Sequence, residues 1–138
     1  MKWLLNIGIA AALISLSAAP VIAQNKETEM NAIAIPAPLD ALVSVVNGGD
    51  TEGYLALLTE DSVVDDNGDR YVGKAEIKTW SDRELIGAKG VMTVQGVETH
   101  GTEIHLIADW KSNFYTGPGR FIFTLRDGKI SEWRIRAI

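Results

Sequence analysis

Apolar positions in the first half of the region 38–138 recur every three to four residues, the spacing of helices with one buried face. Residues 39–46 predict a first helix, which two consecutive glycines end. Asp50 or Thr51 can cap a second helix, which extends to residue 58. A third helix is predicted over residues 73–85. Three short helices therefore come first.

The period of the pattern changes to two after residue 90, which predicts strands. Four strands are expected at residues 91–99, 103–111, 120–126 and 129–136, with turns at residues 100–101, 116–119 and 127–128. A short hairpin is predicted at residues 63–72, around the turn Asn67-Gly68. Because the turns between the four strands are short, these strands form an antiparallel meander with one apolar face.

The order of these elements indicates an α+β fold. Three N-terminal helices and a short hairpin are expected to pack on a curved four-stranded antiparallel sheet. The predicted domain covers residues 38–138. Residues 24–37, which are polar and then rich in alanine and proline, are interpreted as a flexible linker.

Residues 1–23 carry one cation, Lys2, ahead of a long apolar run, and they end in small residues. This pattern is typical of a secretory signal peptide, with cleavage expected after Ala23. A permanent membrane anchor is less favoured, because polar residues interrupt a segment already short for a span of about 20 residues. The mature protein is therefore expected to be exported, periplasmic or secreted, without membrane contact after cleavage.

Removing 23 residues from 138 leaves 115, enough for one domain with a single core. The chain contains no cysteine, so disulfides and a thiol-linked lipid anchor are excluded. The mature part has 12 basic and 18 acidic residues, a net charge of −6. An acidic chain without a basic run offers no electrostatic footprint for nucleic acid.

Five short phrases match the SnoaL-like branch of the nuclear-transport-factor-2-like (NTF2-like) superfamily. They are Gly49-Asp50, residues 57–61, residues 71–77, residues 121–123 and residues 127–130. The chain resembles this family over residues 38–138. The resemblance implies a cone in which a curved sheet wraps around the third helix, a pocket at its wide end, and frequent homodimerisation through the sheet. It implies no single activity, because the superfamily carries many functions on one scaffold.

Asp65 and Asp66 end the apolar strand that begins the hairpin. In the ketosteroid isomerase relatives of this fold a catalytic carboxylate lies at the end of this strand, and the resemblance places Asp66 there. Because side chains alternate along a regular strand, one of the two acids must point inward. Burial would raise the pKa of that acid toward a value useful for proton transfer. The alternative is that both acids belong to a solvated hairpin turn.

Two departures from the isomerase pattern argue against steroid isomerisation by the known arrangement. The resemblance places Leu42 where such enzymes carry a tyrosine, and Phe121 where they carry a protonated acid. Neither side chain donates a hydrogen bond, and stabilising the developing oxyanion is usually the largest catalytic contribution.

Aromatic side chains on the apolar faces can line a pocket, although most of them are expected simply to fill the core. The expected ligand-binding residues are Tyr54, Trp80, Trp110 and Phe123. Tyr54 and Trp80 are the preferred candidates, because their polar groups need partners when buried.

Neither a metal nor a cofactor is expected. His100 and His105 are the two histidines of the chain, and no third ligand is spaced to complete a site with them. Neither a glycine-rich phosphate loop nor a nucleophile elbow occurs in the sequence.

The sequence therefore favours a homodimeric, exported protein that binds a small apolar or amphipathic molecule in a cone-shaped pocket, without catalysis. One alternative is a proton-transfer enzyme of the isomerase, dehydratase or cyclase type, with Asp66 or Asp65 as general base. The other is a dimeric interaction module whose cavity is filled by its own side chains.

Overall fold

Helices and strands follow one another in the predicted order in the part of the chain that the computed structural model describes, residues 32–138. The elements are α2 (Leu39–Asn47), α3 (Thr51–Ala56), β1 (Leu58–Asp66), β2 (Asp69–Val72), α4 (Lys74–Glu84), β3 (Val91–His100), β4 (Glu103–Lys111), β5 (Thr116–Arg126) and β6 (Lys129–Ala137). The predicted signal peptide lies outside the described residues, as does the predicted linker up to residue 31. None of the described helices has the length and apolarity needed to span a membrane.

Local sequence signals set the ends of the helices. The side chain of Asp50 accepts a hydrogen bond of 2.9 Å from the backbone N–H of Gly53 and so caps α3. Gly49 turns the chain between α2 and α3 with a φ of 69°, a conformation that favours glycine. The three helices predicted from the sequence are therefore present, with α3 shorter than expected.

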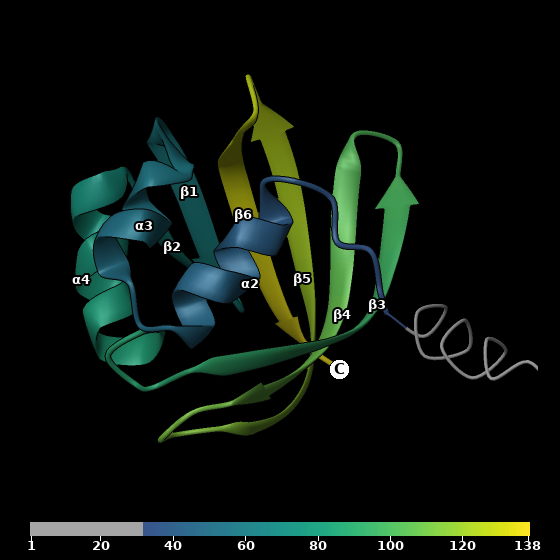
Figure 1. Cartoon of the computed structure of the whole chain (residues 1–138). Helices are drawn as coiled ribbons and strands as arrows, with labels where there is room; N and C mark the ends of the chain where they lie inside the picture. The colour runs from purple at the N-terminus through teal and green to yellow at the C-terminus, as the bar shows by residue number, and fades with distance from the viewer. Residues whose placement is uncertain (1–31) are drawn as a thin grey trace, which may run out of the picture. The chain divides into compact units, whose positions relative to one another are not determined.

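The six strands of the described residues belong to one sheet, in the order β2-β1-β6-β5-β4-β3 (Figure 1). The α+β class is confirmed, but the expectation of a four-stranded sheet is wrong. The β1–β2 hairpin joins the meander because β1 pairs in parallel with β6, which places Val64 beside Trp133. This pairing links segments far apart in the chain, so local alternation of apolar residues carries no information about it.

The strand β5 begins earlier than predicted, because residues 116–119 form strand rather than turn. Pro118 pairs with Asp109 of β4, while the pairing of β5 with β6 reaches only as far as Gly119. Pro118 therefore has a free edge on one side, where its missing N–H costs no ladder hydrogen bond. The turn between β4 and β5 lies at residues 112–115 instead.

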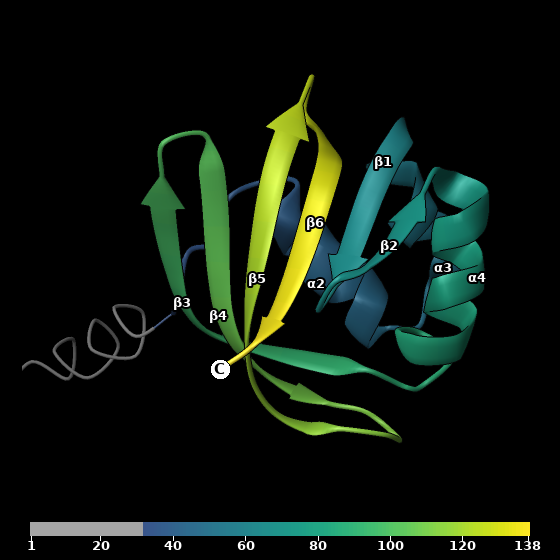
Figure 2. The ribbon, with the colours of Figure 1, turned by 180° about the vertical axis from the view of Figure 1, so that it is seen from behind.

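The helices lie over one face of the sheet, and the core fills the space between them. Figure 1 shows α2 in front of the strands, and Figure 2 shows from behind that no described helix covers the opposite face of β4 to β6. Trp133 of β6 is fully buried at the centre of this core. Its ring centroid lies 6.0 Å from that of Tyr54, 5.9 Å from that of Trp80 and 5.2 Å from that of Phe123.

Candidate functional site

The register between β1 and β6 sends the two adjacent aspartates to opposite faces of the sheet. Val64 is fully buried on the core side, beside Trp133. Side chains alternate along β1, so Asp66 points to the same side as Val64, and Asp65 points to the outer face beside Arg134.

Asp66 is half-buried at the edge of the core. The indole Nε1 of Trp80 donates a hydrogen bond of 3.1 Å to Oδ2 of Asp66, and the side-chain amide of Asn67 donates one of 3.2 Å to Oδ1. Burial raises the pKa of Asp66 above its ordinary value, and the nearby negative charge of Glu84 raises it further. The two hydrogen bonds oppose this rise. Asp66 is thus a carboxyl group whose charged form is disfavoured by its surroundings.

Asp65 has the opposite environment. Two nitrogens of Arg136 donate to its carboxylate oxygens at 2.9 and 3.0 Å, and the backbone N–H of Gly68 donates a third hydrogen bond of 2.8 Å. The guanidinium of Arg136 holds the pKa of Asp65 below its ordinary value. Asp65 is therefore a charged structural residue, which links the hairpin turn at Gly68 to Arg136 of β6.

A cavity of about 430 Å³ lies beside Asp66. It is lined by the last residues of β1 and β6, by the first residues of β5, by the ends of α4 and β4, and by the β4–β5 turn. Its aromatic, aliphatic and charged lining includes Asp66, Trp80, Arg83, Glu84, Trp110, Phe114, Tyr115, Phe121 and Ile135. This volume is within the range of pockets that hold drug-sized molecules. The mostly apolar wall, with the half-buried carboxyl group of Asp66 at one end, would suit an apolar ligand with one polar group.

The structure brings some of the predicted ligand-binding residues to this cavity and leaves others elsewhere. Trp80 and Trp110 both line it. Tyr54 and Phe123 are not among the lining residues: both are fully buried against Trp133 in the core. Asp66 lines the cavity, whereas Asp65 does not.

Several lining residues were missed by sequence reasoning. Phe114 and Tyr115 are 77% and 49% exposed and form one wall of the cavity. Sequence reasoning missed them because it predicts the turn between the strands at residues 103–111 and 120–126 to lie at residues 116–119. Two exposed aromatic residues next to each other in a turn were the available signal.

The positions that the resemblance linked to oxyanion stabilisation hold apolar side chains in the structure. Leu42 is fully buried in the core, and Phe121 lines the cavity. Neither supplies a hydrogen-bond donor to a reacting carbonyl. The donor closest to the inward carboxylate is Trp80, which is already bonded to Asp66. The cavity therefore has an inward carboxyl group at Asp66, and no hydrogen-bond donor at the two positions that the resemblance linked to an oxyanion hole.

Comparison with known proteins identifies the family and the fold. A model of SnoaL-like domains matches residues 39–133. No curated protein matches this chain. Three similar solved structures illustrate the fold.

The first, from Sinorhizobium meliloti and provisionally assigned as a polyketide cyclase, is 21% identical, with a TM-score of 0.66 over 74% of this chain and 95% of its own. The second, a Δ5-3-ketosteroid isomerase from a Mycobacterium species, is 26% identical, with a TM-score of 0.64 over 72% and 89%. The third, from Mycobacterium tuberculosis in complex with estradiol-17β-hemisuccinate, is 22% identical, with a TM-score of 0.64 over 72% and 90%. All three share the NTF2-like fold.

Proposed function

Because this chain belongs to the family of SnoaL-like domains, and because its cavity is open, we propose that it binds a small, mainly apolar molecule in that cavity. The observation that carries the proposal is the half-buried carboxylate of Asp66 on an otherwise largely aromatic and aliphatic wall. A ligand with one hydroxyl group could lie along Trp110 and Phe121 and donate its hydrogen bond to Asp66.

The composition of the cavity narrows the class of ligand. A carboxylate accepts hydrogen bonds and repels anions, so the group that reaches Asp66 should be a neutral or cationic donor. Glu84 lies close enough to raise the pKa of Asp66, which adds to the repulsion of anions at this end. Neutral alcohols and phenols with a rigid apolar body, such as estradiol, fit these requirements.

Titration with estradiol tests the proposal, because two of the lining residues, Trp80 and Trp110, report on the cavity by fluorescence. We expect saturable quenching with one site per chain. Tyr115→Ala should weaken binding by about tenfold, since burying an aromatic side chain is worth ~1.5 kcal/mol. Val72→Ala is the matched control, because Val72 is an exposed apolar residue of β2 that does not line the cavity; this substitution should leave the affinity for estradiol unchanged. Absence of quenching by every neutral hydroxylated steroid tested would contradict the proposal.

A proton-transfer enzyme is the second candidate, and one observation favours it. The carboxyl group of Asp66 faces the cavity, has a raised pKa, and accepts a hydrogen bond from the indole N–H of Trp80. A general base near neutrality needs such a raised pKa. The missing oxyanion donors at Leu42 and Phe121 are the reason for placing binding first. The third reading, a cavity filled by its own side chains, is not supported by a volume of about 430 Å³.

Export and dimerisation are further parts of the proposal. The pattern of residues 1–23 supports export, so mass spectrometry of the processed protein should find Gln24 at the N-terminus, and an intact Met1 would contradict it.

The outer face of the sheet, which carries Ile107 and Ile122 among charged side chains, supports a homodimer. Sedimentation at micromolar concentration should show the dimer, and a monomer alone would refute it.

A further inference from the structure

A cluster of nitrogen and oxygen ligands lies on the outer face of the sheet, away from the cavity. Glu98 of β3 pairs directly with His105 of β4, and His100 follows two residues later on the same side of β3. One ligand atom from each of these three residues lies within 4.8 Å of the other two. The sequence showed two histidines without a third ligand, and the strand register supplies it in Glu98.

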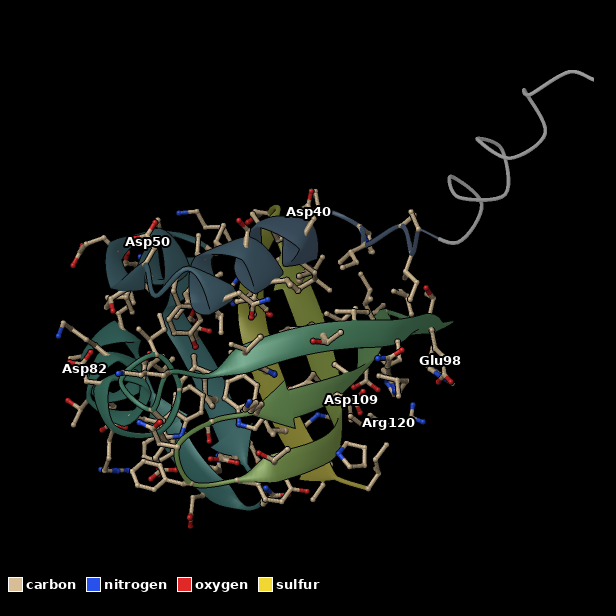
Figure 3. The ribbon with its side chains drawn as sticks, turned by 60° about the horizontal axis from the view of Figure 1, so that its bottom comes forward. Asp40, Asp50, Asp82, Glu98, Asp109 and Arg120 are labelled. Atoms are coloured by element: carbon tan, nitrogen blue, oxygen red, sulfur yellow. The ribbon has the colours of Figure 1, made fainter. Side chains whose placement is uncertain are left out.

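Short contacts already hold this cluster together. Nε2 of His100 lies 2.8 Å from Oε2 of Glu98, and the two imidazole rings are 4.3 Å apart. His100 and Arg120 lower the pKa of Glu98 to about 2, so its side chain is a carboxylate. Figure 3 shows Glu98 and Arg120 side by side, on the opposite side of the molecule from Asp82 of α4.

We propose that Glu98, His100 and His105 form a binding site for a divalent transition-metal ion such as Zn²⁺. Two imidazoles and one carboxylate are a common ligand set for this ion, with water or a fourth group completing the tetrahedron. Ligand atoms about 2.1 Å from a tetrahedral zinc ion lie about 3.4 Å from one another. The largest separation among the three ligand atoms, at most 4.8 Å, exceeds that spacing by about 1.4 Å, a difference that rotation of the exposed side chains of Glu98 and His100 can close.

The side chain of Arg120 lies between two of the three proposed ligands. One nitrogen of its guanidinium, Nη1, lies 2.8 Å from Oε2 of Glu98 and 3.0 Å from Nδ1 of His105. A cation is thus already bound between two of the three proposed ligands. The metal would replace Arg120 there, and the long arginine side chain, about one third exposed, can swing into solvent.

The other ring nitrogen of His105 supports this placement. Nε2 of His105 is buried without a hydrogen-bond partner, and it lies 3.8 Å from Oε1 of Glu103. Histidines that bind a metal through one nitrogen usually donate the other N–H to a carboxylate, which orients the ring. With the metal on Nδ1, the Glu103 carboxylate could accept from Nε2 once their 3.8 Å separation shortens to hydrogen-bond distance. This would satisfy a buried polar atom that the metal-free arrangement leaves unpaired.

The ligand types define which ions should bind. Imidazole nitrogen suits Zn²⁺, Cu²⁺ and Ni²⁺, whereas Mg²⁺ prefers a full set of oxygen ligands. Since the chain has two histidines and no cysteine, any metal site that uses imidazole nitrogen must include His100 or His105. The full chain should therefore be studied without a histidine tag.

Zinc titration of chelator-treated protein tests the site. Calorimetry should give one Zn²⁺ per chain, and NMR should show both imidazole signals shifting together, with no shift on addition of Mg²⁺. His100→Ala, an exposed substitution that leaves the core intact, should weaken Zn²⁺ binding by at least ~100-fold, more than the loss of a supporting carboxylate usually costs. Arg120→Gln should strengthen it by about tenfold, because the competing cation is removed.

Asp109→Asn provides the matched control. Asp109 is an exposed carboxylate on the same face of β4, bonded to Gln95 at 3.0 Å, and its substitution should leave zinc affinity unchanged. The proposal is overturned if the wild-type protein shows no saturable zinc binding up to ~1 mM, the limit of weak specific association. It is equally overturned if His100→Ala and Glu98→Gln both retain wild-type affinity.

Discussion

Trp133→Ala is expected to lower the free energy of unfolding by about 3–5 kcal/mol, the range for removing a buried aromatic side chain. Trp133 is fully buried, and its ring packs against Tyr54, Trp80 and Phe123. These neighbours come from two helices and a strand, so they cannot close the space left by the indole without moving whole elements. Urea unfolding followed by circular dichroism measures the change.

Two further substitutions show whether the loss comes from packing. Trp133→Phe should cost much less than Trp133→Ala, because it keeps an aromatic ring and removes an indole N–H that is buried without a partner. Phe114→Ala, at a position 77% exposed, should change the free energy of unfolding by less than ~0.5 kcal/mol. A cost below ~1 kcal/mol for Trp133→Ala would contradict the packing described for this core.

Asp66→Asn is expected to separate binding from proton transfer. The amide oxygen of asparagine still accepts a hydrogen bond, so estradiol binding should weaken by only about fivefold, the ~1 kcal/mol difference between a charged and a neutral acceptor. Any exchange of solvent deuterium into a bound Δ5-3-ketosteroid should fall by at least ~100-fold, because asparagine is not a base. Fluorescence titration and NMR of the steroid measure the two effects.

Asp65→Asn is the matched control for this experiment. It makes the same chemical change one residue away, where the side chain is bonded to Arg136 on the outer face. Binding and exchange should therefore stay at wild-type levels. Equal losses for the two variants would mean that the inward carboxylate has no special role. An exchange rate at background in the wild-type protein would leave binding as the function of the cavity.

Much of the fold was accessible from local patterns, and the sheet order was not. The helical spacing of Leu39, Leu42 and Val46 and the cap at Asp50 act over a few residues, so they could be read directly. The parallel pairing of β1 with β6 depends on contacts between distant segments, with a register shift between Leu58 and Val63. No local signal encodes such a pairing.

The candidate site, like the fold, could be predicted only in part from local sequence patterns. Alternation along β1 predicted that one of Asp65 and Asp66 points inward, but the choice depended on Val64 lying beside Trp133. The wall formed by Phe114 and Tyr115 depended on where the β4–β5 turn falls. Pro118 and its neighbouring glycines are typical of turns, and only the free edge of β5 at that point lets them lie in a strand.

The central feature of the site is that Asp66 faces the cavity while Asp65 is held by Arg136. NMR titration of the two side-chain carboxyl groups tests it most directly, using Asp65→Asn and Asp66→Asn to assign the signals. We expect Asp66 to titrate above the ordinary aspartate value of about 3.9, and Asp65 below it. Saturating estradiol should shift the Asp66 signal and leave that of Asp65 unchanged. Titration of both groups near 3.9, or a ligand-induced shift at Asp65 alone, would contradict the account.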